Sequence, residues 1–424
     1  PLTGSVTDPS GAVIPGAKIS IKNTATGVIT NAATNSAGLY NVPNVIPGPY
    51  QVTVSAQGFQ TELRSGITLT VGEQQVLNLS LRVGQTTQTV SVSGEAPAVQ
   101  LATSTISATV NATTVRALPL NGRDWTTLAT LQPGVVSTAS IQNSAGATQF
   151  QRGNRGLGVQ MAISGARPQL NNYRIDGITV NDYANGGPGS VQGGTLGVDA
   201  IQEFSVLTSN YTAQYGRTAG GVINAITRSG TNQFHGSAYE FLRNSSLDAA
   251  NFFDNFSNVP NPPFRQNQFG ASAGGPIRKD RTFFFADYEG LRENLSTTIL
   301  ANVPSSNARA GILNFPGGPS TFPSGCVPTS TPNQCTVTVS PLVQPYLPLW
   351  ALPNAGLLGE GNTGLYSFPG KQADSENFVT GRIDNKISEK DSLFGSWEYD
   401  HATQILPDSV NDVLNPSNTT RVLV

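Results

Sequence analysis

Apolar and polar residues alternate along much of this chain, and Gly, Pro and Asn separate the alternating segments. In the first 83 residues the alternation is clearest at 50–54, 67–71 and 77–81. A period of two places every second side chain on the same face of a strand. The pattern therefore predicts a small antiparallel β-sandwich over 1–83, with one buried face per sheet.

From residue 232 onward the predicted strands become longer and richer in aromatic residues: 232–243, 265–276, 282–293, 375–387, 392–402 and a sixth beginning near 417. The connections alternate between long loops, at 244–264 and 294–374, and short turns, at 277–281 and 388–391. Outer-membrane barrels show this asymmetry, with short periplasmic turns and longer extracellular loops. A loop as long as 294–374 would be unusual in a soluble domain.

The region between these two parts, 105–231, mixes a short helix with strands. Asp124 is expected to cap a helix in which Trp125, Leu128 and Leu131 recur every three residues. Asp176-Gly177, between apolar segments, is a hairpin signal. The Gly-rich stretch 185–197 is expected to be a loop.

The organising stretch is 198–243, where Tyr215-Gly216 precedes the pair Gly220-Gly221 and a short apolar strand ending in a turn at 229–232. On its own this pattern predicts a glycine hinge between two strands. The whole stretch, however, resembles the end of the plug domain of TonB-dependent outer-membrane receptors, where a YG motif and a GGVIN strand lead into the first barrel strand.

Two further segments resemble the same plug. ISGARP at 163–168 and YRIDGITVN at 173–181 follow its RG…LDG pattern, with Ser164 in place of the family's first Arg and Ile175 in place of its usual Leu. These departures, with LPLNGRDW at 118–125, resemble the Oar-like subgroup more than the siderophore receptors. The resemblance implies a set of plug-motif residues: Arg167, Asp176, Gly177, Tyr215, Gly216, Gly220, Gly221 and Asn224.

The first unit also resembles a known module. GSVTDPSGAVIPGAKISI at 4–21 and the segment 34–59 are similar to the carboxypeptidase regulatory-like domain, a transthyretin-like β-sandwich. The name describes an accessory domain and implies no peptidase. Related modules have a carbohydrate-binding-like fold, so the resemblance admits a glycan as substrate.

A polar connector, 84–104, is expected between sandwich and plug. Part of it loosely resembles a TonB box, which pairs with TonB by strand addition, a contact that needs mainly an exposed extended backbone. The candidate TonB-contact residues are Gln88, Thr89, Val90, Ser91, Val92, Ser93 and Gly94. A last edge strand of the first domain is the alternative interpretation.

Composition limits the classes of function. Only 12% of residues are charged, and the net charge is −2, so nothing indicates nucleic-acid binding. No apolar run approaches the roughly 20 residues of a transmembrane helix, a limit that does not exclude barrel strands of about 9–11 residues. The chain opens without a signal-peptide pattern and both ends look cut, so we expect a fragment that lacks most of the barrel.

Few residues are suited to chemistry. Cys326 and Cys335 are too few for a four-thiolate zinc site, and we expect a local disulfide in an oxidising compartment, with two free thiols as the alternative. The two histidines, His235 and His401, show no metal-binding spacing, and nucleophile-elbow and phosphate-loop motifs are absent. We therefore expect no enzyme activity, cofactor or metal. Charged contacts between plug and barrel are expected from three residues: Arg167, Arg174 and Arg217.

The sequence thus predicts a mainly β protein: a transthyretin-like sandwich at 1–83, a connector at 84–104, an α+β plug at 105–231 and the first antiparallel strands of a transmembrane β-barrel at 232–424. The family resemblance implies outer-membrane transport coupled through TonB, with the accessory domain in the periplasm. Its expected partners are the TonB complex, outer-membrane lipid and an extracellular glycan or peptide, and not nucleic acid. The rival hypothesis is a secreted or surface-exposed β-rich adhesion or carbohydrate-binding protein without transport. A metallopeptidase is disfavoured by the histidine count.

Overall fold

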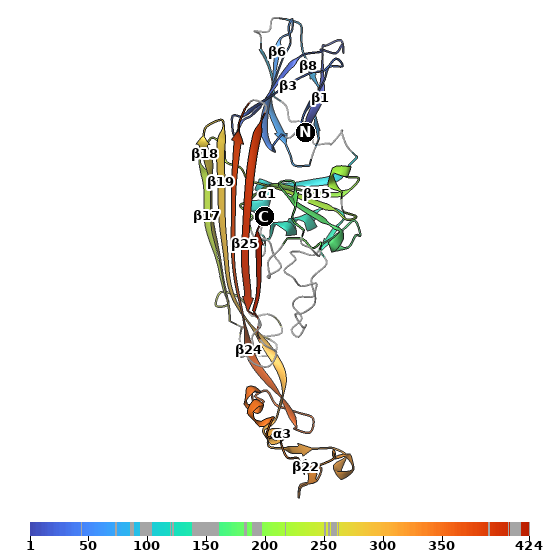
Figure 1. Cartoon of the computed structure of the whole chain (residues 1–424), viewed down its shortest axis with the longest axis vertical. Helices are drawn as coiled ribbons and strands as arrows, with labels where there is room; N and C mark the ends of the chain where they lie inside the picture. Colours follow the sequence, from blue (N-terminus) through green and yellow to red (C-terminus); the bar gives the residue numbers. More distant parts are fainter. Residues whose placement is uncertain are drawn as a thin grey trace.

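The computed structural model describes residues 1–423 except for the following positions: 44, 73, 85–88, 94–103, 119, 121–122, 138–160, 182–184, 189–196, 217, 250–251, 253–254, 256–260, 262, 389–390, 406 and 408–416. Three parts follow one another along the chain (Figure 1). Below we call them the sandwich, the plug (after the family resemblance) and the wall, a sheet of long strands.

The sandwich consists of two sheets. One has the order β4-β1-β7, with β8 also paired to β1, and the other has the order β3-β2-β5-β6-β9. The strands are β1 (Leu2–Thr7), β2 (Lys18–Asn23), β3 (Ile29–Ala33), β4 (Leu39–Val42), β5 (Gly48–Ser55), β6 (Thr61–Leu69), β7 (Gln75–Val76), β8 (Leu79–Ser80) and β9 (Thr89–Ser93). The alternating apolar residues meet between the sheets as predicted, and Leu2, Ile21 and Val52 are fully buried there.

The last of these strands comes from the expected connector. β9 pairs in parallel with β6, with Val92 opposite Arg64, and ends the sheet order. The structure therefore makes 89–93 an edge strand of the sandwich, as the alternative interpretation has it, and TonB contact at this segment stays a prediction. Gln88 and Gly94, the ends of the candidate TonB-contact segment, lie outside the described residues.

The plug is built on a five-stranded sheet with the order β10-β15-β16-β13-β14. Its elements are β10 (Ile106–Asn111), α1 (Ala112–Ala117), η2 (Trp125–Leu131), β11 (Val135–Ser137), β12 (Met161–Ile163), η4 (Pro168–Leu170), β13 (Asn172–Ile175), β14 (Ile178–Thr179), β15 (Ile201–Ser209), η5 (Ala213–Tyr215) and β16 (Val222–Thr227). The predicted hairpin is present: β13 and β14 are joined by Asp176 and Gly177, both with positive φ.

The predicted helix forms as a 3-10 helix, η2. The Asp124 carboxylate accepts a hydrogen bond from the Thr126 backbone N–H at 2.9 Å, which caps the helix. Trp125 is 1% exposed and packs against Phe204 of β15 with ring centroids 5.2 Å apart. This short helix thus anchors the plug sheet.

The glycine pair is needed for close packing. A Cβ on Gly220 would lie 2.4 Å from Asn171 Oδ1 and 2.9 Å from the Leu170 carbonyl, and a Cβ on Gly221 would lie 2.4 Å from Ile163 Cγ2. The Gly221 N–H donates to Asn171 Oδ1 at 3.0 Å. These contacts let β16 enter the sheet against β13, so the pair is a packing site and not only a hinge.

The wall is antiparallel, with the order β17-β18-β19-β24-β25-β26 and β23 paired to β24. Its strands are β17 (His235–Asn244), β18 (Phe264–Arg278), β19 (Thr282–Pro304), β23 (Leu357–Leu358), β24 (Thr363–Lys386), β25 (Ser392–Ile405) and β26 (Ser417–Leu423). All six predicted strands are present. The plug lies against one face of the wall, the sandwich lies beyond one end and a small projection lies beyond the other (Figure 1).

One prediction about the wall was wrong: 294–374 is not a single loop. β19 continues to Pro304 and β24 begins at Thr363, and the two remain paired over this whole length. β-branched and aromatic residues favour the extended pairing, and Val303 and Phe368 are buried in it. The loop proper is confined to 305–362.

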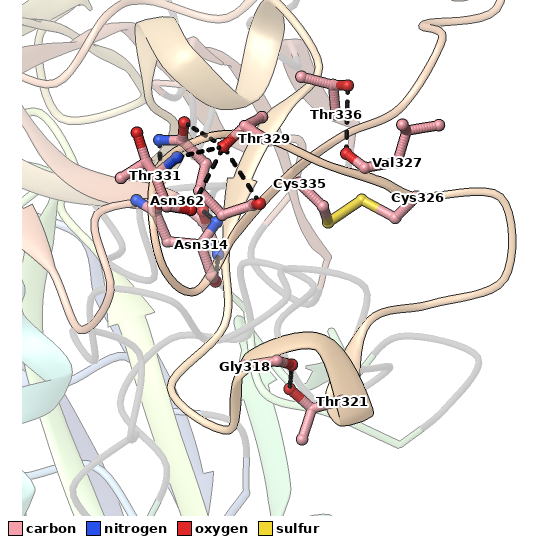
Figure 2. Close-up of a disulfide and its surroundings, with 11 residues drawn as sticks. Asn314, Gly318, Thr321, Cys326, Val327, Thr329, Thr331, Cys335, Thr336 and Asn362 are labelled. Carbon is pink, nitrogen blue, oxygen red and sulfur yellow. Dashed lines mark hydrogen bonds between the residues drawn. A yellow bond between two sulfur atoms is a disulfide. The ribbon is translucent and has the colours of Figure 1, made fainter.

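This loop folds into the projection. It contains α3 (Ser306–Arg309), η6 (Gly318–Thr321), η7 (Gln344–Leu349) and a small sheet of β20 (Ile312–Asn314), β22 (Gln334–Thr336) and β21 (Val327–Pro328). Cys326 and Cys335 are disulfide-bonded with their Cα atoms 5.5 Å apart, beside the pairing of β21 with β22 (Figure 2).

The sandwich contacts both other parts. Asn232, just before β17, donates from its side chain to the Thr26 carbonyl at 2.7 Å, and Lys386 at the end of β24 donates to the Ile29 carbonyl. The Val71 N–H donates to the carboxylate of Glu203 on β15. The sandwich therefore lies at the end of the wall where the short turns are. Among the described residues, no helix has the length and apolar character needed to cross a membrane.

We expect Gly220→Ala to destabilise the plug by about 1–3 kcal/mol, because the new methyl group overlaps backbone atoms of Leu170. Hydrogen exchange of the β16 amides measures the effect. Gly216→Ala is the matched control, since its Cβ would be 3.5 Å from the nearest atom and its φ is −55°. Equal exchange in the two variants would contradict the packing role.

Candidate functional site

The wall turns polar side chains toward the plug. Strand residues alternate between two faces, and many buried positions on the face toward the plug are polar: Gln268, Ser272, Asp287, Glu289, Asp374, Glu376, Thr380, Arg382, Asp384 and Asp400. An apolar cluster on the same face, Phe285, Leu291 and Phe378, packs with Ala200 of the plug. The opposite face carries exposed apolar side chains such as Tyr288, Ile383 and Trp397. This is the inverse of a soluble sandwich and matches a barrel with a polar interior.

The first polar centre is built around Arg382 of β24. Its Nη1 is 3.0 Å from Asp176 Oδ1 in the plug hairpin, and its Nη2 and Nε are 2.8 and 2.9 Å from the two carboxylate oxygens of Asp384. The Arg382 and Asp176 side chains are 3% and 2% exposed. Nη1 also donates to the Thr227 carbonyl at 3.1 Å. A single guanidinium thus joins the wall to the plug in a buried setting.

Asp176 has partners within the plug as well. Its carboxylate accepts from the Thr227 N–H at 3.0 Å and from the Thr227 hydroxyl at 2.6 Å. On the wall side, Asp384 accepts from the hydroxyl of Ser229 at 2.8 Å. The hairpin of β13 and β14, the end of β16 and strand β24 therefore meet at this centre.

The second centre is built around Arg123, which has a left-handed backbone with φ 53°. Its Nη2 is 2.8 Å from Asp199 Oδ2 of the plug, and its Nε is 2.9 Å from Glu289 Oε1 of β19. The guanidinium lies 4.1 Å from the ring centroid of Tyr239 on β17. Burial alone would lower the pKa of Arg123, but Glu289, Tyr239 and Asp199 more than offset it, and the pKa is raised.

Glu289 is fully buried and has further partners. It accepts from Gln268 Nε2 of β18 at 2.8 Å and from the Gly197 N–H of the plug at 3.0 Å. Two residues earlier on the same face, Asp287 is 2% exposed, and within the described part of the chain neither of its carboxylate oxygens has a hydrogen-bond partner. An unpaired buried carboxylate is costly, so this interface is not optimised for stability.

The predicted plug-motif residues do not form one cluster. Gly216 ends η5, Asn224 lies in β16, and the Tyr215 ring lies 5.3 Å from the Arg174 guanidinium. Gly220 packs against Leu170 and Asn171, and Gly221 packs against Ile163. Asp176, with Gly177 completing its turn, is the motif residue that joins the plug–wall ion pairs found within the described part of the chain.

The predicted arginine contacts were wrong for two residues. Arg174 donates to the carbonyls of Gly177 and Gln214 in its own unit, Arg167 precedes η4, and neither belongs to the ion pairs found among the described residues. The left-handed hairpin turn brings the Gly177 carbonyl to Arg174, which uses its donors locally. Arg217 lies outside the described residues.

Arg123 and Arg382, which do join the two parts, were not singled out from the sequence. Arg382 lies at an inward position of an alternating strand, two residues before Asp384, and this spacing was the available signal. His235 and His401 lie on β17 and β25 as predicted. Within the described ranges no three potential metal ligands gather.

Comparison with known families agrees with this geometry. Models of three families match consecutive parts of the chain: the carboxypeptidase regulatory-like domain at 1–82, the TonB-dependent receptor plug domain at 85–222 and an outer membrane β-barrel domain at 226–422. The barrel match contradicts the rival hypothesis of an adhesion protein without a barrel.

Individual relatives are receptors and transporters. The chain is 28% identical over 267 residues to the TonB-dependent transporter Oar of Myxococcus xanthus, covering 60% of this chain and 23% of Oar. It is 31% identical over 136 residues to the probable TonB-dependent siderophore receptor PirA of Acinetobacter baumannii, covering 30% of this chain and 16% of PirA. The chain thus spans less than a quarter of the length of either relative.

Among solved structures, a mutant of the ferric enterobactin receptor PfeA from Pseudomonas aeruginosa matches with a TM-score of 0.36 and 16% identity, over 71% of this chain and 33% of that chain. The sandwich, the plug and the barrel strands, matched in this order by three family models, show that the chain belongs to the TonB-dependent receptors of the outer membrane.

Proposed function

We propose that this chain imports an extracellular substrate by TonB-coupled displacement of its plug. The observation that carries the proposal is how the two polar centres divide. Arg382 keeps Asp384 on its own strand, and Asp176 keeps Thr227 within the plug. The second centre divides in the same way.

There Arg123 keeps Asp199 within the plug, and Glu289 keeps Gln268 within the wall. When the plug separates from the wall, each charged side chain therefore retains a partner of its own. Leaving a buried charge unpaired costs several kcal/mol, and this division avoids much of that cost. Such an interface closes tightly and still opens under a modest force.

The orientation follows from the sandwich. It contacts the short-turn end of the wall through Asn232 and Lys386, and a periplasmic accessory domain places that end in the periplasm. The projection at 305–362 then faces outward, where a substrate arrives. A glycan or a peptide is the substrate class we favour, because the accessory module resembles a carbohydrate-binding-like fold and the family resemblance is to Oar. Transport, and not catalysis, is the activity proposed.

We further propose that TonB reaches the receptor at β9. This strand ends the sandwich sheet, and its outer edge has no partner among the described residues. Strand addition needs such an edge. Edge strands are commonly protected from pairing with other chains. An edge strand that is left available therefore offers a docking place, at little cost to the rest of the structure.

Arg382→Gln tests the division of the interface. The change leaves Asp176 and Asp384 buried without a cation, and removing one partner of a buried pair costs about 3–5 kcal/mol. We expect a loosened plug and entry of a bulky, normally excluded antibiotic without TonB, measured by growth inhibition. Arg278→Gln, at an exposed turn, is the control. Exclusion equal to wild type would show that this centre does not hold the plug.

Val92→Pro tests the coupling segment, because proline removes a backbone donor and fixes φ. Uptake should be lost while substrate binding at the cell surface stays within about twofold of wild type. Val92→Thr keeps a β-branched residue and should retain uptake. A melting scan separates the roles: if Val92→Pro unfolds the sandwich, or if uptake survives, β9 is only a structural edge.

Orientation is checked by cysteine labelling in intact cells, with Cys326 and Cys335 left as a disulfide. A cysteine at Asn307 in the projection should react with an impermeant maleimide, and one at Lys279 in a short turn should react only after the outer membrane is permeabilised. The reverse pattern would invert the proposed topology.

A further inference from the structure

The face of the wall opposite the plug changes character along its length. Arg382 on β24 and Glu289 on β19 point toward the plug. Because side chains alternate along a strand, the residues next to them on each strand point away from the plug. Near the short turns this outer face is apolar, with Phe234, Ile383, Leu393 and Trp397 well exposed. Tyr288, Val379 and Tyr399 are register partners at the next level.

Aromatic residues continue to the far border of this apolar band. Tyr399 stacks on Trp397 with centroids 6.1 Å apart, and Phe269, at the far border, packs against Tyr288 at 6.1 Å. Aromatic girdles lie at the two edges of the lipid-facing band of outer-membrane barrels. The band extends from Leu393, opposite Asn385, to the level of Phe269. This length matches the about 9–11 residues that a barrel strand needs to cross the membrane.

Immediately beyond the girdle the outer face becomes basic. Arg292 comes first, then Arg265 opposite Asn294, then Lys371 opposite Ser296. At the same levels the carboxylates of the strands, Glu293 and Asp374, alternate to the inner face. Arg243, opposite Gln266, also points inward, so the inner face carries both signs of charge at these levels, whereas the outer face of the described strands at the same levels carries cations and no carboxylate.

The outward cations surround a hollow. A cavity of about 410 Å³ is lined by Arg265 and Lys371, with Asn244, Asn294 and Ser296 between and beside them. Arg265 and Lys371 are exposed, and neither is among the residues for which the described part of the chain shows an ion pair. They lie two strands apart, roughly 10 Å, so their long side chains can reach one anion placed above Asn294.

We propose that this basic cluster binds a phosphate group of an outer-leaflet lipid. The cluster lies at the border of the lipid-facing band, on the side of the projection, and this is the level of the lipid headgroups. Its two cations and three neutral polar side chains suit a phosphate ester, because Arg and Lys are preferred phosphate ligands and no carboxylate opposes the charge. The choice of leaflet rests on the orientation under Proposed function; phosphate binding itself does not.

The test is native mass spectrometry of the receptor in an uncharged detergent, titrated with diphosphorylated lipid A. We expect a retained lipid in the wild type and roughly thirtyfold weaker binding in the Arg265→Gln/Lys371→Gln variant, as two basic groups at an anionic surface should contribute. Arg278→Gln/Lys279→Gln removes two exposed cations near the short turns and should leave binding unchanged. Both substitution pairs lie on exposed side chains, and heat-dependent gel mobility confirms that the barrel is folded.

Four outcomes count against the proposal. Equal binding by wild type and Arg265→Gln/Lys371→Gln, or equal loss in the control, would show that the cluster is not the site. Inorganic phosphate displacing lipid A at equal molar concentration would indicate a free-phosphate site. Preference for phosphatidylglycerol over lipid A would place the cluster at the other leaflet and contradict the orientation, while leaving phosphate recognition intact.

Discussion

The buried guanidinium of Arg382 imposes the strongest constraint on this structure. A charge that is 3% exposed requires partners, and it has them only if β24 presents this position to the plug and the β13–β14 hairpin presents Asp176. A shift of β24 by one residue would turn Arg382 to the lipid face and Ile383 inward. The register of the wall and the left-handed turn at Asp176 are therefore specified together.

The interface around this contact is mixed, with the polar centres beside an apolar cluster of Ala200, Phe285, Leu291 and Phe378. An apolar interface of similar size would be hard to separate, because its exposed halves would face water without compensation. Here the charged side chains on each side of the interface have a partner on their own side. Separation therefore replaces the ion pairs across the contact with hydration by water, while Arg382 stays paired with Asp384. Asp287, buried without a hydrogen-bond partner among the described residues, lowers the stability of the closed state further.

How much of this was predictable depends on sequence distance. The Asp124 cap, the Asp176-Gly177 hairpin and the strand alternation are local patterns, and the structure confirms them. The partnership of Arg382 with Asp176 joins residues far apart in the chain, and nothing local distinguishes Arg382 from any other inward residue. From the sequence, Arg174 was a candidate for the same role. In the structure, its turn places the Gly177 carbonyl within hydrogen-bond reach of the Arg174 guanidinium. The extension of β19 and β24 was missed because pairing between distant segments is visible only in three dimensions.

Two routes connect β9, the edge proposed for TonB contact, to the plug. The chain itself runs from β9 toward β10, and a second route passes through the sheet, since β9 pairs with β6 and β6 ends at Leu69, two residues before Val71. The Val71 N–H is bonded to Glu203 on β15, and β15 pairs with β16, whose last residue, Thr227, holds Asp176. Meanwhile the turn that contains Thr26 is bonded to Asn232 at the rim of the wall. β9 therefore belongs to a domain that is bonded to both the plug and the wall. Among the described residues, the Glu203 carboxylate holds the sandwich to the plug sheet, and backbone and side-chain contacts from Asn232 and Lys386 hold it to the wall.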